Sequence, residues 1–234
     1  MKDTVVTGFR VIGCGIKSQA LIEQVRVLRF DGLKTEVVTE SDVLSPDSDD
    51  QMVIVLAPDY FEGLNNLLKK FYQAGILTIL ISACNFDLPS GVCDSCTTVK
   101  PEQFADIVKV LAGSLFVQGF VNYDFNDLSL TLRNTGNFYI YEAEGKFAEA
   151  VNSLSKQSGI FEGAENGALL ITVDRDKTQV RVEDIELLSK YLSTLPENIN
   201  MRWALYNDDT LSADTVRISV IIAGKNCRNN RLEK

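Results

Sequence analysis

Hydrophobic residues in the first hundred positions alternate between short continuous runs and helical spacing. Continuous apolar runs of this length predict strands covered on both faces, and apolar residues recurring every three or four positions predict helices. The strands are predicted at 9–12, 36–39, 52–57 and 76–81. The helices between them carry Leu21, Ile22, Val25 and Leu28, and then Leu64, Leu67, Leu68 and Phe71. This order is typical of a parallel α/β sheet.

The order of elements changes after about position 100. Residues 85–99 interrupt the pattern and are interpreted as a loop, and a broad apolar stripe then predicts a helix over 101–116. Further helices are predicted to Leu132 and at 146–154 and 182–195, with strands at 137–142, 168–173, 201–206 and 215–223. The last two strands are predicted to form a long hairpin. We therefore expect a truncated Rossmann-like parallel-sheet domain (1–100), a central helix (101–118) and an α+β domain (119–234).

Composition and charge exclude several classes of function. Apolar residues are 45% and charged residues 24%, as in ordinary globular proteins. Lys+Arg number 23 and Asp+Glu 32, so the net charge is −9, and an acidic chain without a basic cluster is a poor nucleic-acid binder. The longest apolar runs are far too short to span a membrane, and the first residues do not form a signal peptide. We expect a cytoplasmic protein that does not contact membranes directly.

The chain contains no histidine. This excludes Ser-His-Asp and Cys-His nucleophiles and zinc sites ligated by histidine. The odd number of cysteines, 5, argues for reduced thiols. Cys93 and Cys96 have the spacing of a metal-ligand pair, but no second pair accompanies them. We interpret this segment as an ordinary loop and predict no metal.

The first candidate site is a glycine turn between the first strand and its helix. Gly13, Gly15 and Ser18 form G-x-G-x-x-S, in which backbone N–H groups at a helix start can face a phosphate. Glu40, near the end of the second strand, is a candidate for binding a ribose. The motif is one glycine short of the dinucleotide fingerprint, so a simple tight turn remains an equal alternative.

The second candidate site consists of Asn122, Asp124 and Asp127. Three side-chain oxygen groups within six residues can position a water or a cation. Asp124, followed three residues later by Asp127, also fits the N-cap of a helix that ends at Leu132. A capped helix with solvated carboxylates therefore stays open beside a catalytic role.

The segment 119–127, Gly-Phe-Val-Asn-Tyr-Asp-Phe-Asn-Asp, fits the pattern G-x-x-N-x-D-F-x-D of the synergy loop of FtsZ. Residues 9–25 resemble the first phosphate loop and helix of FtsZ. Segments that follow in the FtsZ order are 133–136, 145–154, 167–173, 182–195 and 214–224. The chain thus resembles a divergent, shortened bacterial member of the FtsZ/tubulin superfamily.

This resemblance implies a GTP-binding domain, a central helix, a second α+β domain and head-to-tail filaments in cell division. In FtsZ the GTP lies on one subunit and the synergy loop of the next subunit completes the active site. Asn122, Asp124 and Asp127 would then orient a water against the nucleotide of a neighbour. The implied partners are FtsZ-like filament subunits or further copies of this chain.

The chain also departs from FtsZ. The glycine-rich loop after the third strand is replaced by 57–64, where Asp59 and Glu62 put negative charge near the expected triphosphate. We therefore expect a non-hydrolysing pseudo-GTPase, without a required cofactor although GTP is possible, that caps or modulates filaments. One alternative is a GTP-binding filament-forming GTPase with an atypical pocket. Another is a Rossmann-like binder of a dinucleotide or other small ligand through Gly13, Gly15 and Ser18.

Overall fold

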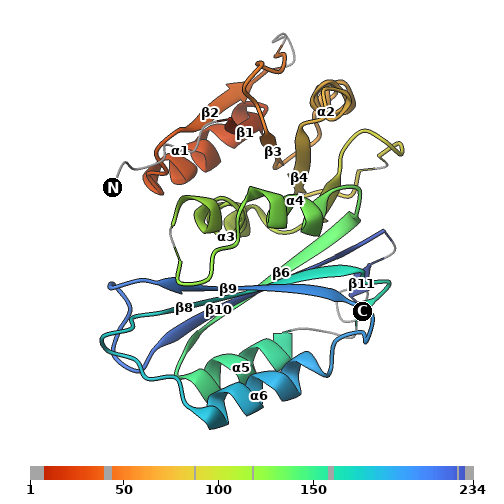
Figure 1. The fold of residues 1–234 in the computed structure, drawn as a ribbon. Coiled ribbons are helices and arrows are strands. Elements are labelled where there is room, and N and C mark those ends of the chain that lie inside the picture. Colours follow the sequence, from red (N-terminus) through yellow and green to blue (C-terminus); the bar gives the residue numbers. More distant parts are fainter. Residues whose placement is uncertain are drawn as a thin grey trace. The chain divides into compact units, whose positions relative to one another are not determined.

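The computed structural model describes residues 8–39, 44–86, 88–117, 119–157, 161–225 and 227–229 (Figure 1). Contacts divide the chain into two compact units. The first unit comprises Met1–Phe116 and Leu132–Gly136, and the second comprises Val117–Thr131 and Asn137–Lys234. Each unit contains a hydrophobic core of its own.

The first unit contains a sheet of parallel strands in the order β2-β1-β3-β4-β5. The strands are β1 (Phe9–Cys14), β2 (Leu33–Val38), β3 (Met52–Ala57), β4 (Leu77–Ser82) and β5 (Ser95–Thr98). The helices are α1 (Gln19–Val27), α2 (Leu64–Gln73) and α3 (Phe104–Phe116), with 3-10 turns at Ile16–Ser18 and Pro101–Gln103.

Helices cover both faces of this parallel sheet. Helix α2 packs its Leu68 and Phe71 against one face, on Ile12 and Val55 of the strands. Helices α1 and α3 contact each other and lie on the opposite face, where the Phe116 ring meets Phe9 edge-on with 5.9 Å between the centroids. Burial on both faces explains why these strands read as continuous apolar runs.

The second unit contains strands in the order β6-β10-β8-β9, in which β10 is antiparallel to β6 and β8, and β9 is parallel to β8. The strands are β6 (Gly136–Gly145), β8 (Asn166–Val173), β9 (Asn200–Asn207) and β10 (Val216–Gly224). The helices are α4 (Phe125–Leu132), α5 (Phe147–Gln157) and α6 (Val182–Leu192). The two-residue strands β7 (Phe161–Glu162) and β11 (Arg228–Asn229) pair antiparallel.

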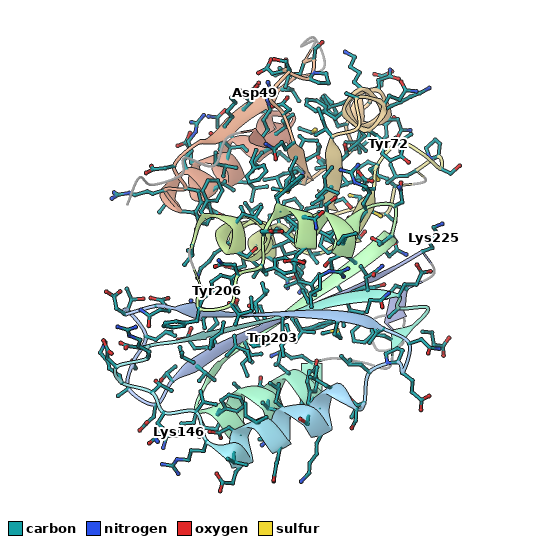
Figure 2. All side chains as sticks on the ribbon, in the orientation of Figure 1. Asp49, Tyr72, Lys146, Trp203, Tyr206 and Lys225 are labelled. Atoms are coloured by element: carbon teal, nitrogen blue, oxygen red, sulfur yellow. The ribbon has the colours of Figure 1, made fainter. Side chains whose placement is uncertain are left out.

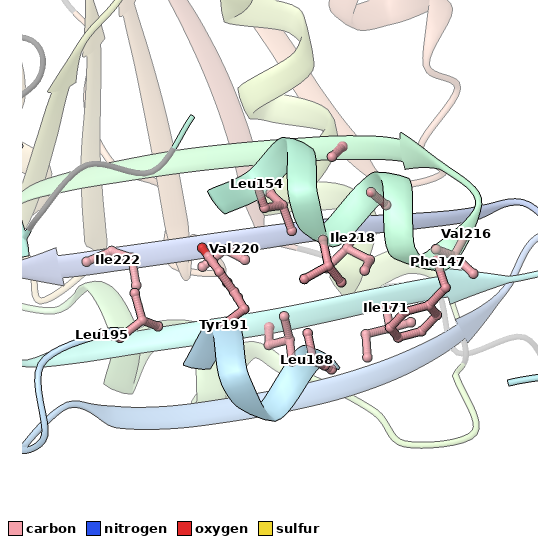
Figure 3. Packing of buried hydrophobic residues seen from close by; sticks show 14 of the residues in the cluster. Phe147, Leu154, Ile171, Leu188, Tyr191, Leu195, Val216, Ile218, Val220 and Ile222 are labelled. Carbon is pink, nitrogen blue, oxygen red and sulfur yellow. The ribbon is translucent and has the colours of Figure 1, made fainter. Parts of the chain in front are cut away.

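Helices α5 and α6 lie side by side on one face of the second sheet (Figure 3). Leu154 from α5 and Leu188 and Tyr191 from α6 point toward the strands, where they meet Ile218 and Val220 of β10. These side chains are buried and form the core of the unit. The helices predicted at 146–154 and 182–195 are confirmed, although Ile185 of the predicted apolar stripe is exposed.

The predicted hairpin of 201–206 with 215–223 is wrong. Strand β9 pairs with β8, while β10 lies between β6 and β8. The reason is burial: β10 is buried at all positions except Arg217 and takes a central place, whereas β9 exposes Asn200, Trp203 and Asn207 and lies at the edge. Both edges of β10 are taken by β6 and β8, so β9 pairs with β8 instead.

The interpretation of residues 85–99 as a loop is also wrong in part. Residues 95–98 form β5, which extends the parallel sheet beside β4. Its sequence Ser-Cys-Thr-Thr is polar and short, so no apolar run marks it. The N–H of Asp94 donates to the Thr78 carbonyl at 2.9 Å and holds the strand in register. The other predicted helices and strands are confirmed, with shifts of a few residues at their ends.

The expected α/β fold class is confirmed. In the part of the chain that the structure describes, no helix is long and apolar enough to cross a bilayer.

Candidate functional site

A hollow of about 550 Å³ lies at the carboxyl ends of β1, β2 and β3. This edge of an open parallel sheet is where ligands usually bind, because the loops that leave the strands diverge there. The hollow is lined by Cys14, Gly15, Ile16, Lys17, Thr39, Asp59, Tyr60 and Phe61. The glycine turn of the first candidate site therefore forms one of its walls.

The members of the glycine turn play different parts. Gly15 lines the hollow, with a φ of 76° and a ψ of 167° that favour glycine, and its N–H donates to the Val38 carbonyl at 2.8 Å. Ser18 is buried, and its hydroxyl donates to the Gly15 carbonyl at 2.6 Å. Gly13 leaves room for Ser18, because a Cβ at position 13 would lie 2.5 Å from the Ser18 Oγ. Gly13 and Ser18 thus shape the turn, and Glu40 lies outside the described residues.

An ion pair stands at the hollow. The Lys17 ammonium donates to Asp59 Oδ2 at 2.5 Å, and the N–H of Tyr60 donates to Asp59 Oδ1 at 2.9 Å. The hydrogen bond from Lys17 lowers the pKa of Asp59, and the same bond raises the pKa of Lys17. Both groups are therefore charged at neutral pH, and their opposite charges compensate each other. Burial raises the pKa of the Cys14 thiol to about 12, which leaves it neutral.

The loop that carries the second candidate site is anchored to β9. The N–H of Phe120 donates to the Leu205 carbonyl at 2.8 Å, and the N–H of Leu205 donates to the Val121 carbonyl at 3.0 Å. Gly119 is needed for this close approach: a Cβ there would lie 2.6 Å from the Leu205 oxygen and 2.9 Å from the ring of Tyr206 (labelled in Figure 2). The start of the loop is therefore fixed by backbone pairing.

The three predicted residues lie together at the start of α4. Asn122 Oδ1 accepts the N–H of Gly119 at 2.8 Å. Asp124 Oδ1 accepts the N–H of Asp127 at 3.0 Å, and Asp127 Oδ2 accepts the N–H of Asp124 at 3.3 Å. This reciprocal pair is a capping box, which confirms the predicted N-cap and the helix to Leu132. Asn122 and Asp124 are nevertheless exposed and present oxygen atoms to solvent.

Three residues that the sequence analysis did not single out support the loop. The hydroxyl of buried Tyr123 donates to Thr131 Oγ1 at 2.8 Å, and Thr131 donates to the Asp127 carbonyl at 2.8 Å. Burial raises the pKa of Tyr123, so it stays a neutral donor. Arg202 of β9 pairs with Asp127, with 3.7 Å between Nε and Oδ1. The position of Tyr123 between polar residues was a signal in the sequence that this tyrosine supports the loop. No such signal marks Arg202, because it is distant from the loop along the chain.

The described residues contain one group of three carboxylates close enough to share a metal ion: Asp47, Asp49 and Asp50. Arg10 bonds to Asp47 and lies 2.9 Å from Asp50, measured from Nε to Oδ1. Lys34 lies 3.4 Å from Asp49. Arg10 and Lys34 thus pair with all three carboxylates, so these ion pairs account for the group.

Comparison of the sequence with protein-family models and with curated proteins gives no match. Solved structures do match. An empty FtsZ dimer from M. jannaschii superposes with a TM-score of 0.73 at 15% identity, over 99% of this chain and 95% of that one. GDP-form protofilaments of TubZ from Bacillus thuringiensis serovar israelensis give 0.64 at 11% identity, over 93% and 84%. The chain therefore has an FtsZ/tubulin-like fold.

Proposed function

We propose that this protein is a non-hydrolysing FtsZ-like subunit that caps or modulates filaments in cell division through protein–protein contacts. The fold supports an origin among filament-forming GTPases. The matched structures are described as a dimer of FtsZ and as protofilaments of TubZ. In this proposal the 119–127 loop docks on the nucleotide-bearing face of a filament subunit.

The observation that carries the proposal is a contrast between the two candidate sites. In the hollow, Lys17 is paired with Asp59 and the N–H of Gly15 is used by Val38. In the 119–127 loop, Asn122 and Asp124 are exposed on a backbone that is fixed to β9. The chain is thus better equipped to contact a neighbour's ligand than to bind a triphosphate of its own.

The test is the effect of this protein on FtsZ filaments from the same organism. Substoichiometric protein is added to FtsZ with GTP, and filament length and phosphate release are measured. We expect shorter filaments and an altered rate of GTP turnover. Asp124→Asn is expected to lose the effect, because asparagine keeps the N-cap bond but removes the charge.

Asp31→Asn is the matched control, since it removes one exposed carboxylate outside both candidate sites. Filaments that are unchanged by the wild-type protein contradict the proposal. An Asp124→Asn protein as active as the wild type assigns the contact to another surface.

A working GTP-binding protein is the second candidate. A hollow of about 550 Å³ is large enough for a nucleotide, and Lys17 at its edge could bind a phosphate that displaces Asp59. Calorimetric titration of nucleotide-stripped protein with GTP and GDP, with and without magnesium, separates the candidates. A micromolar dissociation constant, which corresponds to a binding free energy of about −8 kcal/mol, favours the GTPase. The absence of binding at millimolar nucleotide favours the pseudo-GTPase.

A further inference from the structure

The hollow lies at the carboxyl ends of parallel strands, a position that suits an anionic ligand, but the charged side chains that line it do not favour an anion. Among its lining residues, Lys17 is the basic one and Asp59 the acidic one. The ammonium of Lys17 would attract a phosphate if it were unpaired. It is instead bonded to Asp59 at 2.5 Å, so the pair has no net charge to offer.

Both oxygens of Asp59 are held. Oδ2 takes the Lys17 ammonium, and Oδ1 takes the N–H of Tyr60 at 2.9 Å. A cationic ammonium and a backbone N–H are the donors that proteins use for phosphate oxygens. The carboxylate of Asp59 therefore satisfies, from within the chain, the same donors that an incoming phosphate would need.

The fold brings Lys17 and Asp59, two exposed side chains, together at the hollow. Asp59 follows β3 by two residues, and Lys17 lies in the 3-10 turn after β1, so the two side chains come from segments that leave adjacent parallel strands. The hydrogen bond from Lys17 lowers the pKa of Asp59, which keeps the carboxylate ionised at neutral pH. A free phosphate would have to displace a tethered anion and would also meet its negative charge.

We propose that Asp59 is a built-in anion that keeps phosphate ligands out of the hollow. Replacing it with alanine releases Lys17 and the Tyr60 N–H and turns the hollow into a polyphosphate site. This inference rests on the proposed function and adds the residue that determines the loss of nucleotide binding.

The experiment is calorimetric titration with inorganic tripolyphosphate and, separately, with GTP and magnesium. The proteins are the wild type, Asp59→Ala and Asp59→Asn. Glu62→Ala is the matched control, because it removes an exposed carboxylate from the same loop without lining the hollow. The double variant Asp59→Ala with Lys17→Gln tests whether the new binding uses Lys17. Circular dichroism verifies that each variant is folded, and Asp59→Asn preserves the side-chain volume if Asp59→Ala fails to fold.

We expect Asp59→Ala to bind tripolyphosphate and GTP at least about tenfold more tightly than the wild type, a difference of about 1.4 kcal/mol. Asp59→Asn should show a smaller gain, because its amide oxygen can still accept the Tyr60 N–H. The double variant should lose the gain, and Glu62→Ala should resemble the wild type.

The outcomes separate the two proposals. Asp59 variants that bind no more tightly than the wild type, or a Glu62→Ala protein that gains as much, overturn the role of Asp59. If that happens while the wild type binds no GTP, the proposed pseudo-GTPase still stands. Micromolar GTP binding by the wild type contradicts the pseudo-GTPase, and a further tenfold gain in Asp59→Ala would then still support the role of Asp59.

Discussion

At the scale of single residues, Asp94 shows how one buried carboxylate connects distant segments. Its Oδ2 accepts the N–H of Thr78 at 2.8 Å, and its Oδ1 accepts the N–H of Asn134 at 3.1 Å. The backbone carbonyl of Asp94 accepts a third N–H, from Gly136, at 3.0 Å. Asp94 is about 1% exposed and Thr78 is buried, so water cannot replace the bond between them. Asp94 thereby fixes the turn 133–136 against the starts of β4 and β5.

Replacing Asp94 should destabilise the first unit. Asp94→Ala leaves the buried N–H of Thr78 without an acceptor, which costs about 1–3 kcal/mol. It also removes the bond to Asn134, an exposed residue whose N–H can bind water instead. Urea unfolding of the variant, compared with the wild type, measures this loss. An equally stable Asp94→Ala would mean that the two N–H groups find other acceptors.

Asp94 also makes stability depend on pH, with a definite sign. Burial raises its pKa above the unfolded value, although the bonds from Thr78 and Asn134 oppose this shift. A raised folded pKa contributes stability that is present below the unfolded pKa and is lost as the pH rises through the folded pKa. As the pH rises from the unfolded to the folded pKa of Asp94, the unfolding free energy of the wild type should therefore fall relative to that of Asp94→Asn. Parallel unfolding free energies across the acidic range would show that the carboxylate does not titrate differently on folding.

At the scale of elements, the turn between β1 and α1 depends on two glycines for different reasons. Gly13→Ala places a methyl group 2.5 Å from the Ser18 Oγ and 2.9 Å from Ile22, and overpacking of this kind costs about 1–3 kcal/mol. Gly15→Ala meets no atom within 4 Å, but its φ of 76° with ψ of 167° is essentially restricted to glycine and costs about 1–3 kcal/mol.

Chemical denaturation and tripolyphosphate titration of these variants separate structure from binding. We expect both alanine variants to unfold at lower urea. Because Gly13 faces Ser18 and not the hollow, adding Gly13→Ala to Asp59→Ala should leave ligand binding nearly unchanged, provided that the protein folds. A complete loss of binding in that pair would place Gly13 in direct contact with the ligand.

The periodicity of the sequence predicted these elements well where burial is strong. Strand β3 is apolar at every position and was located to the residue, and α4 was bounded by its Asp124 cap and Leu132. Strand β5 was not predicted, because three polar residues and one cysteine carry no clear periodic signal. The pairing of β9 and β10 was predicted wrongly, because it depends on which strand is more buried within the whole sheet. The residues of the turn between the two strands do not carry that information.

The candidate sites follow the same rule. The glycine turn and the 119–127 loop were identified from the sequence because their residues are adjacent along the chain. The pairing of Lys17 with Asp59 spans 42 residues, and that of Arg202 with Asp127 links β9 to α4. Such pairs arise only when the sheet brings separate loops together. The sequence therefore reveals the motifs, and the fold reveals what neutralises or supports them.

At the scale of the whole molecule, the net charge of −9 separates two modes of assembly. Two copies of this chain repel each other at long range, and salt screens that repulsion. In the proposed docking, we expect the exposed Asp124 carboxylate to bind cationic groups on the nucleotide-bearing face of the filament, an attraction that salt also screens. Self-association and filament binding should therefore respond to salt with opposite signs.

The measurement compares ionic strengths between about 0.1 and 1 M, over which the Debye length falls from about 10 to 3 Å. We expect the mass of the protein alone, from sedimentation equilibrium, to stay constant or to rise with salt, equally in the wild type and in Asp124→Asn. Co-sedimentation of the wild type with FtsZ filaments should weaken with salt, and Asp124→Asn should bind more weakly with a shallower dependence. Equal salt slopes for the two proteins would show that the carboxylate makes no electrostatic contact with the filament, because the capping bond that asparagine retains is insensitive to ionic strength.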